Sequence, residues 1–445
     1  MRKKLGPAQT VFLGFLLLVL LGTFLLSLPA ATRTGERAPF VDALFTANSA
    51  VCVTGLIVSD TGQYWSLFGQ IVILVLIQFG GLGYMTTAGL LVLMLRHKIT
   101  MEEKLALKEG MDQLTMADVS HFLKQIVKFT FLVEGVGAVV LSTYWYGKFG
   151  MPACVFQGIF HSISALCNAG FCLFSNNLES YTGDMVVSIT IMVLVVIGGL
   201  GYTVIRDLYR HYVTKKELGS RHLLLHTKAV LFMTFILIAA GAFGIFIIES
   251  LNPGVFLELT FKEKILSSLF QAITPRTAGF STLPIGQLAV PTLMLMMFLM
   301  FVGASPGGTG GGAKTTTLLV LVCSAWSTMK RRRNVNLFGR RISDQAIRSS
   351  LAIFVMGVSL IAVIAFFMLN IEDKGFLPIL FEIFSAFGTV GLSTGITPHL
   401  NSAGKLLLVL TMFIGRIGLL TFGVAIARQG QKELYRYPEE KILVG

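Results

Sequence analysis

Long apolar runs alternate with shorter apolar segments along this chain. Runs of roughly 20 residues, the length that crosses the hydrocarbon core of a bilayer, predict eight membrane-spanning helices arranged in pairs. A shorter apolar segment between the members of each pair is typical of a half-helix that enters the membrane and turns back. The long runs lie near 11–30, 66–95, 125–147, 184–209, 226–250, 288–328, 348–370 and 404–427, and the short segments near 40–50, 153–165, 262–274 and 376–386.

A glycine-containing stretch follows each short segment. The stretches are residues 49–56, 164–171, 273–280 and 385–392, and each reaches a glycine that is followed by Leu or Phe. A single stretch of this kind is more often a helix-packing surface than a binding site. Four of them in register, at nearly constant spacing, indicate four structural repeats. The shared glycines are Gly55, Gly170, Gly279 and Gly391.

The repeats predict an all-α membrane protein with four parallel M1-P-M2 units (span, pore half-helix, span) around a central pore. Each unit has an even number of spans, so all four have the same orientation and are related by a pseudo-fourfold axis along the membrane normal. We expect repeats at 1–98, 99–215, 216–335 and 336–428, with a broken second span in the third, and a short cytoplasmic tail at 429–445.

Composition supports a membrane location. Of the 445 residues, 54% are hydrophobic and only 13% are charged, whereas a soluble domain carries charge on about a quarter of its residues. Most Lys and Arg lie at the termini and between the repeats, which predicts that the termini are cytoplasmic and that the glycine-containing stretches open toward the outside. This distribution accounts for the net charge of +13 without a nucleic-acid partner.

The glycine-containing stretches have the chemistry of a cation-selective filter. A dehydrated cation needs oxygen ligands, and rings of backbone carbonyls supply them without a full charge. Glycine permits the backbone angles that turn carbonyls inward, and no Asp or Glu lies in the four stretches. The candidate filter residues are Val51, Cys52, Val53, Thr54, Gly55, Leu166, Cys167, Asn168, Ala169, Gly170, Pro275, Arg276, Thr277, Ala278, Gly279, Phe387, Gly388, Thr389, Val390 and Gly391.

The sixth apolar run predicts a gate. As one helix, residues 290–328 would extend to nearly twice the hydrocarbon thickness, and Pro306 among many glycines breaks it. We expect the break to lie under the filter on the cytoplasmic side, with hydroxyl groups holding a closed form. The candidate gate residues are Gly303, Ala304, Ser305, Pro306, Gly307, Gly308, Thr309, Gly310, Gly311, Gly312, Ala313, Lys314, Thr315, Thr316 and Thr317.

Glycines also recur in the other second spans, where they are typical of close contact between helices. These are Gly80, Gly81, Gly83, Gly198, Gly199, Gly201, Gly415 and Gly418.

The four stretches resemble those of the Trk/Ktr/HKT superfamily of potassium transporters. The resemblance rests on residues 276–280 and 385–392, on the glycine of every stretch and on the broken third-repeat span, and it covers essentially the whole chain. It implies potassium uptake across the bacterial plasma membrane, a homodimer surrounded by membrane lipid, and a cytosolic KtrA-like ring that binds ATP or ADP. It implies no enzyme activity and no cofactor in this chain. Glycine at all four positions matches the potassium-selective members.

Arg416 interrupts the last apolar run. A cation there is costly unless it is paired or faces water, and pairing with backbone carbonyls or an acid is one interpretation. The family resemblance favours a second, in which Arg416 belongs to the gate as an electrostatic barrier just inside the filter.

Two other functions fit less well. A phosphate-binding loop needs Gly before Lys-Thr, where this chain has Ala313, and a strand before the loop. A transporter of organic substrates more often has inverted repeats, unlike the parallel fourfold pattern.

Overall fold

The computed structural model describes residues 7–94, 119–212, 223–252 and 254–419. Helices dominate these ranges, as predicted, and the proposed tail at 429–445 lies outside them. The α-helices are α1 (Pro7–Leu26), α2 (Phe40–Val51), α3 (Leu67–Met94), α5 (Val119–Phe149), α6 (Ala153–Leu166), α7 (Met185–Leu200), α8 (Tyr202–Tyr212), α9 (Leu225–Leu251), α10 (Phe261–Ile273), α11 (Val290–Val302), α12 (Thr315–Met329), α13 (Asp344–Ile371), α14 (Phe376–Gly388) and α15 (Ser402–Ile417). Short 3₁₀ turns at Pro29–Ala31, Glu179–Tyr181, Ile285–Gln287 and Thr397–His399 and a hairpin of β1 (Asn336–Leu337) and β2 (Arg340–Arg341) complete them.

Four short helices, α2, α6, α10 and α14, coincide with the four predicted half-helices. Local sequence explains where they begin: Pro39 and Pro152 precede α2 and α6, and Thr260 forms a capping box with Glu263 at α10. Each ends at or inside its glycine-containing stretch, where the backbone becomes left-handed. The inward faces of these helices are buried, so their C-terminal ends lie inside the protein.

Three described helices are long and apolar enough to cross a membrane alone. They are Lys124–Phe149 within α5, α9 and α13. The pair α7 and α8 could form a fourth span, but it is bent by 96°. The helices α1, α11 and α12 are also apolar but shorter.

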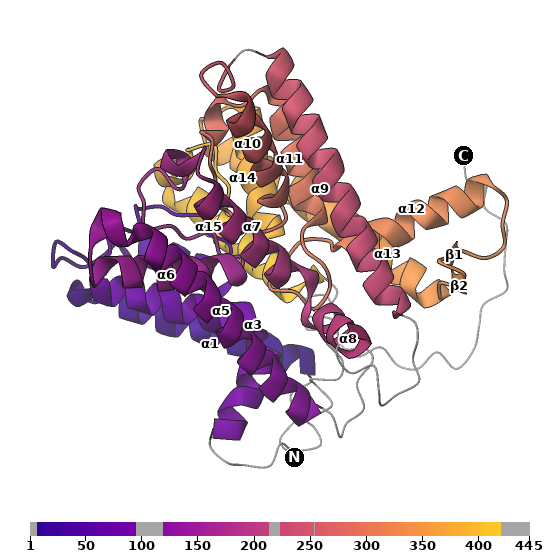
Figure 1. Cartoon of the computed structure of the whole chain (residues 1–445), viewed down its shortest axis with the longest axis horizontal. Coiled ribbons are helices and arrows are strands. Elements are labelled where there is room, and N and C mark those ends of the chain that lie inside the picture. Colours follow the sequence, from indigo (N-terminus) through magenta and orange to yellow (C-terminus); the bar gives the residue numbers. More distant parts are fainter. Residues whose placement is uncertain (1–6, 95–118, 213–222, 253, 420–445) are drawn as a thin grey trace.

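The four predicted repeats, residues 1–98, 99–215, 216–335 and 336–428, are here called the quarters of the chain. Helices from neighbouring quarters form a closed ring of contacts. The helix that follows each glycine-containing stretch packs on the next half-helix: α3 on α6, α7 on α10, α11 on α14, and α15 back on α2. Figure 1 shows the quarters gathered in this way, with α12, β1 and β2 projecting from the helical body. The contact between α15 and α2 joins the last quarter to the first.

A left-handed glycine interrupts the helix after each stretch. Gly83 has φ 75° inside α3, Gly201 has φ 92° between α7 and α8, Gly303 has φ 69° after α11, and Gly418 has φ 89° after α15. The expectation that only the third of these helices is broken is therefore wrong. Helix packing alone does not explain Gly83, Gly201 and Gly418.

The remaining glycines do allow close packing, as predicted. A Cβ at Gly80 would overlap the Val51 carbonyl oxygen, and one at Gly415 would overlap that of Phe387. A Cβ at Gly198 would likewise overlap the Leu166 carbonyl oxygen. Each of these glycines lets a helix approach the end of the half-helix of its own quarter.

Candidate functional site

The four predicted filter glycines meet in one closed ring. A Cβ on Gly55 would overlap the Ala169 carbonyl oxygen, and a Cβ on Gly170 would lie 2.9 Å from that of Ala278. A Cβ on Gly279 would lie 2.5 Å from the Val390 oxygen, and one on Gly391 would overlap that of Thr54. Each glycine thus backs onto the carbonyl that precedes the glycine of another stretch, and the four contacts close into a ring. The contacting pairs are Gly55 with Ala169, Gly170 with Ala278, Gly279 with Val390, and Gly391 with Thr54.

The backbone of the four stretches alternates in handedness. The residue two positions before each glycine has a positive φ although it carries a side chain, as at Val53 (55°) and Thr277 (76°). A non-glycine residue in this conformation is held there by its surroundings. Alternation of this kind turns successive peptide planes, which is what a ladder of carbonyls along one path requires. The paired positions are Val53 and Gly55, Asn168 and Gly170, Thr277 and Gly279, and Thr389 and Gly391.

A buried hydroxyl at the start of each stretch holds this backbone. Ser49 and Ser385 accept hydrogen bonds from the N–H of Gly55 (3.0 Å) and Gly391 (3.1 Å). Ser164 and Thr274 instead donate to the carbonyls of Phe171 and Phe280, at 2.8 and 2.5 Å. These four residues were not among the predicted site residues, although a hydroxyl recurs at the start of every stretch.

In the third stretch the hydroxyl residue lies one residue closer to the glycine than in the others. Thr274 lies five residues before Gly279, whereas the serines lie six before their glycines. The Arg276 side chain points away from the ring, donating to the Thr234 hydroxyl on α9 at 3.1 Å. Arg276 is a predicted filter residue, but only its backbone can contribute to the stretch, because its side chain is turned toward α9.

The loop between α11 and α12 lies directly against three of the four stretches. The hydroxyl of Thr389 accepts from the Gly311 N–H at 3.0 Å, and a Cβ on Gly310 would overlap the Thr277 hydroxyl. Thr309 donates through its hydroxyl to the Leu166 carbonyl at 3.4 Å. The predicted gate residues are therefore in contact with the predicted filter residues.

Hydrogen bonds fix the two edges of this loop. On one edge, the backbone N–H groups of Ser305 and Thr309 donate to the carbonyls of Gly199 and Gly198, at 3.1 and 3.2 Å. On the other, Thr315 donates through its hydroxyl to that of Ser305 at 3.0 Å. The loop thus occupies the break in the helix α7–α8, which explains why that helix is open at Gly201.

Two cationic side chains donate hydrogen bonds to carbonyls of the loop. Arg416 donates to the carbonyls of Thr309 and Gly80, and Lys314 donates to those of Gly310 and Gly311. The interpretation that Arg416 pairs with backbone carbonyls is confirmed. Because Gly80 and Thr309 belong to different quarters, Arg416 links the loop to the first quarter.

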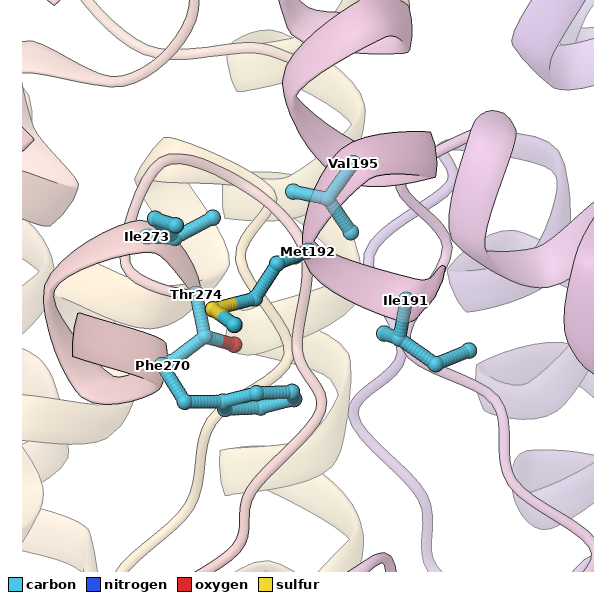
Figure 2. A pocket seen from close by; sticks show the side chains of 7 residues that line it. Ile191, Met192, Val195, Phe270, Ile273 and Thr274 are labelled. Atoms are coloured by element: carbon cyan, nitrogen blue, oxygen red, sulfur yellow. The ribbon is translucent and has the colours of Figure 1, made fainter. Parts of the chain in front are cut away.

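A small apolar pocket lies beside the third stretch, between α7 and α10 (Figure 2). The one hydroxyl in its lining, that of Thr274, donates a hydrogen bond to the Phe280 carbonyl. A pocket without a free polar anchor does not have the character of a site for an organic solute. Its lining consists of Ile191, Met192, Val195, Phe270, Ile273, Thr274 and Ala278.

Comparison with known proteins identifies the class of molecule that carries this site. The family described as TrkH, cation transport protein, matches residues 15–435, and the chain belongs to that family. The family consists of ion transporters, not enzymes. Its members are membrane proteins, in agreement with the composition and the helical fold.

Individual relatives match over nearly the full length. The Ktr system potassium uptake protein B of Bacillus subtilis is 40% identical over 99% of this chain and 97% of its own. The potassium/sodium uptake protein NtpJ of Enterococcus hirae is 37% identical over 100% and 98%. The potassium transporter TrkH of Vibrio parahaemolyticus has the same fold, with a TM-score of 0.69, 18% identity, and coverage of 93% of this chain and 84% of its own.

Proposed function

We propose that this chain is the ion-translocating subunit of a Ktr-type system and carries potassium into the cell across the bacterial plasma membrane. The closed ring of four glycines and four carbonyls is the observation that carries the proposal. It is supported by the relatives named as Ktr potassium uptake proteins. On this view the chain has four M1-P-M2 repeats and eight spans around a pseudo-fourfold pore, with the repeat bounds predicted above and both termini in the cytoplasm.

The ring acts as the selectivity filter in this proposal. The carbonyls of Thr54, Ala169, Ala278 and Val390 replace the water of a potassium ion. Fixed hydroxyls behind the stretches and the left-handed residues keep those carbonyls in place. The negative C-terminal ends of the four half-helices add to the attraction for a cation.

The loop between α11 and α12 acts as the gate. It lies against the filter stretches, it is irregular where a helix would be expected, and its hydrogen bonds can be exchanged for water when it withdraws. Arg416 and Lys314 place positive charge beside the same path, which opposes a passing cation where the local dielectric constant is low.

Ion flux into liposomes that contain only this protein tests the proposed function. We expect uptake of Rb⁺, a potassium substitute, to exceed uptake of Na⁺ by roughly a hundredfold or more, because rings of backbone carbonyls are the filter chemistry of potassium-selective pores. Empty liposomes are the control. Equal uptake of the two ions would contradict potassium selectivity and would instead agree with the potassium/sodium description of the Enterococcus relative.

Neutralising Arg416 tests the barrier. We expect Arg416→Gln to raise Rb⁺ uptake per reconstituted protein about tenfold, because both a repulsive charge and the link between the loop and α3 are removed. The control is Arg37→Gln, since Arg37 is an exposed arginine outside the filter, the loop and the proposed docking surface. If Arg416→Gln left both flux and its activation at wild-type values, the charge would have only a structural role.

Regulation is assigned to other chains. We propose a homodimer embedded in membrane lipid, with a cytosolic KtrA-like ring that binds ATP or ADP and acts on the gate. The name "Ktr system" of the Bacillus and Vibrio relatives supports a second component. The ring docks on the basic face formed by residues 96–128, 206–228 and 330–348 and by the tail after residue 428. The exposed arginines between α12 and α13 belong to this face; they are Arg331, Arg332, Arg333, Arg340 and Arg341.

A further inference from the structure

In three half-helices, a buried polar side chain at the same position binds the chain beyond the glycine. His161, Gln271 and Glu382 each lie three residues before the hydroxyl residue that opens the stretch. All three are completely buried. A buried polar group is costly unless it is hydrogen-bonded, so its partners indicate what it does.

Glu382 holds the chain that leaves the fourth stretch. Its carboxylate accepts from the hydroxyl of Ser393 at 2.7 Å, from the N–H of Thr394 at 3.0 Å and from the hydroxyl of Thr397 at 2.7 Å. Ser393 and Thr394 follow Gly391 by two and three residues. The carboxylate therefore ties the outer end of the stretch to its own half-helix through charge-assisted hydrogen bonds.

His161 does the same in the second repeat with different chemistry. Its Nδ1 donates to the Gln157 carbonyl at 2.8 Å, which leaves Nε2 as an acceptor. Nε2 accepts from the N–H of Leu173 at 3.3 Å and lies 3.2 Å from the Cys172 sulfur. Cys172 and Leu173 are again two and three residues beyond the glycine, here Gly170.

Gln271 completes the set in the third repeat. Its amide donates to the Ser281 hydroxyl at 3.0 Å, and Ser281 lies two residues after Gly279. Ser281 also accepts from the Leu283 N–H at 3.3 Å. Although Thr274 lies one residue closer to its glycine than the serines do, Gln271 contacts the residue two positions after the glycine, as His161 and Glu382 do.

The first repeat departs from the pattern. Thr46 occupies the equivalent position, and its hydroxyl donates to the Asp42 carbonyl of its own helix at 2.8 Å. The residues two and three beyond Gly55 are Ile57 and Val58, whose side chains carry no polar group. Three of the four stretches are therefore tied at their outer ends, and one is not tied at this position.

We propose that Glu382, His161 and Gln271 are positioning residues for ion selection, with Glu382 the strongest. Each fixes the chain two or three residues beyond the glycine, while the hydroxyl residue fixes the glycine itself or the residue that follows it. Two successive ties to the half-helix hold the ring carbonyls at the spacing that separates ions of different size. This inference rests on the proposed filter function.

Substitution of Glu382 tests the assignment. We expect Glu382→Met, which keeps length and removes the acceptors, to lower the Rb⁺/Na⁺ uptake ratio in liposomes roughly tenfold. Glu382→Gln keeps an acceptor oxygen and should retain most of the ratio. Ser393→Ala removes one donor from a half-buried site and should lower the ratio about threefold.

Glu249→Met is the matched control. Glu249 is an equally buried carboxylate, but it accepts from Ala289 and Thr292 at the start of α11, away from the ring. Its substitution should lower the thermal unfolding temperature and leave the ratio unchanged. A purely structural role for Glu382 predicts the same result for both Met variants.

Each outcome decides the question. A wild-type ratio in reconstituted Glu382→Met would overturn the assignment while leaving the filter proposal intact. If Glu382→Met did not assemble, a wild-type ratio in Ser393→Ala would overturn the assignment in its place. If wild-type protein did not prefer Rb⁺, the proposed function would fail, and this assignment with it.

Discussion

A Gly391→Ser protein is expected to lose about a hundredfold in its Rb⁺/Na⁺ uptake ratio, the equivalent of about 3 kcal/mol of discrimination. Gly391 has φ 93°, a conformation that L side chains rarely adopt. A Cβ there would overlap the Thr54 carbonyl oxygen and come within 2.9 Å of Gly55 Cα. One of the four ring carbonyls must therefore move, and ion selection changes with it. The measurement is paired Rb⁺ and Na⁺ flux in liposomes.

Gly35→Ser is the control for this substitution. Gly35 has a φ of 73°, so a serine there would carry the same backbone strain, but no atom lies within 4 Å of the position of its Cβ. Its replacement should leave the ratio unchanged. An unchanged ratio in Gly391→Ser at normal membrane abundance would refute the assignment of the glycine ring as the filter.

Shortening the loop between α11 and α12 is expected to have the second large effect. Deletion of residues within 307–312 should raise Rb⁺ uptake by roughly tenfold and weaken its dependence on the cytosolic partner. The reason is that this segment makes the hydrogen bonds that hold the loop against the filter, including Gly311 to Thr389 and Thr309 to Gly198. Flux per protein, with and without the partner, is the measurement.

Deletion of Gly339 is the control. It shortens the connection between α12 and α13 and leaves the loop between α11 and α12 intact. Gly339 lies in the turn between β1 and β2, where no atom is within 4 Å of the position of its Cβ. Its loss should not affect flux measured without the partner. If the loop deletion assembled normally and conducted no more than wild type, with regulation intact, the loop would not be the gate.

The half-helices and the meeting of the four stretches could be predicted from the sequence because both depend on local, repeated signals. An apolar segment too short to span, followed by a glycine in register, specifies where a half-helix ends. The broken third helix was equally visible, since Pro306 lies in a glycine-rich run. The all-α membrane fold followed from the same patterns, whereas the eight-span arrangement stays a proposal.

The breaks in the other three helices could not be predicted, because their cause is distant in sequence. A glycine in an apolar run fits both a packing contact and a break. At Gly201 the break depends on the loop, since the next N–H, that of Tyr202, donates to the Gly307 carbonyl at 3.2 Å. The hydrogen bonds from the half-helices to the chain beyond the glycines could not be predicted for a related reason. The role of Glu382 becomes visible only when the fold brings Ser393 next to it.

The contact between α15 and α2 has a consequence for the making of the protein. Asn48 in α2 donates to the Val409 carbonyl at 3.1 Å, and Lys405 pairs with Asp42 at 2.7 Å. Synthesis proceeds from the N-terminus, so α2 is made long before α15 exists. Until then the amide and the carboxylate lack these partners, at a cost in an apolar setting. The first quarter of the chain therefore completes its polar contacts only after the last quarter has been made, and a chain cut short before residue 405 would leave Asn48 and Asp42 without these partners.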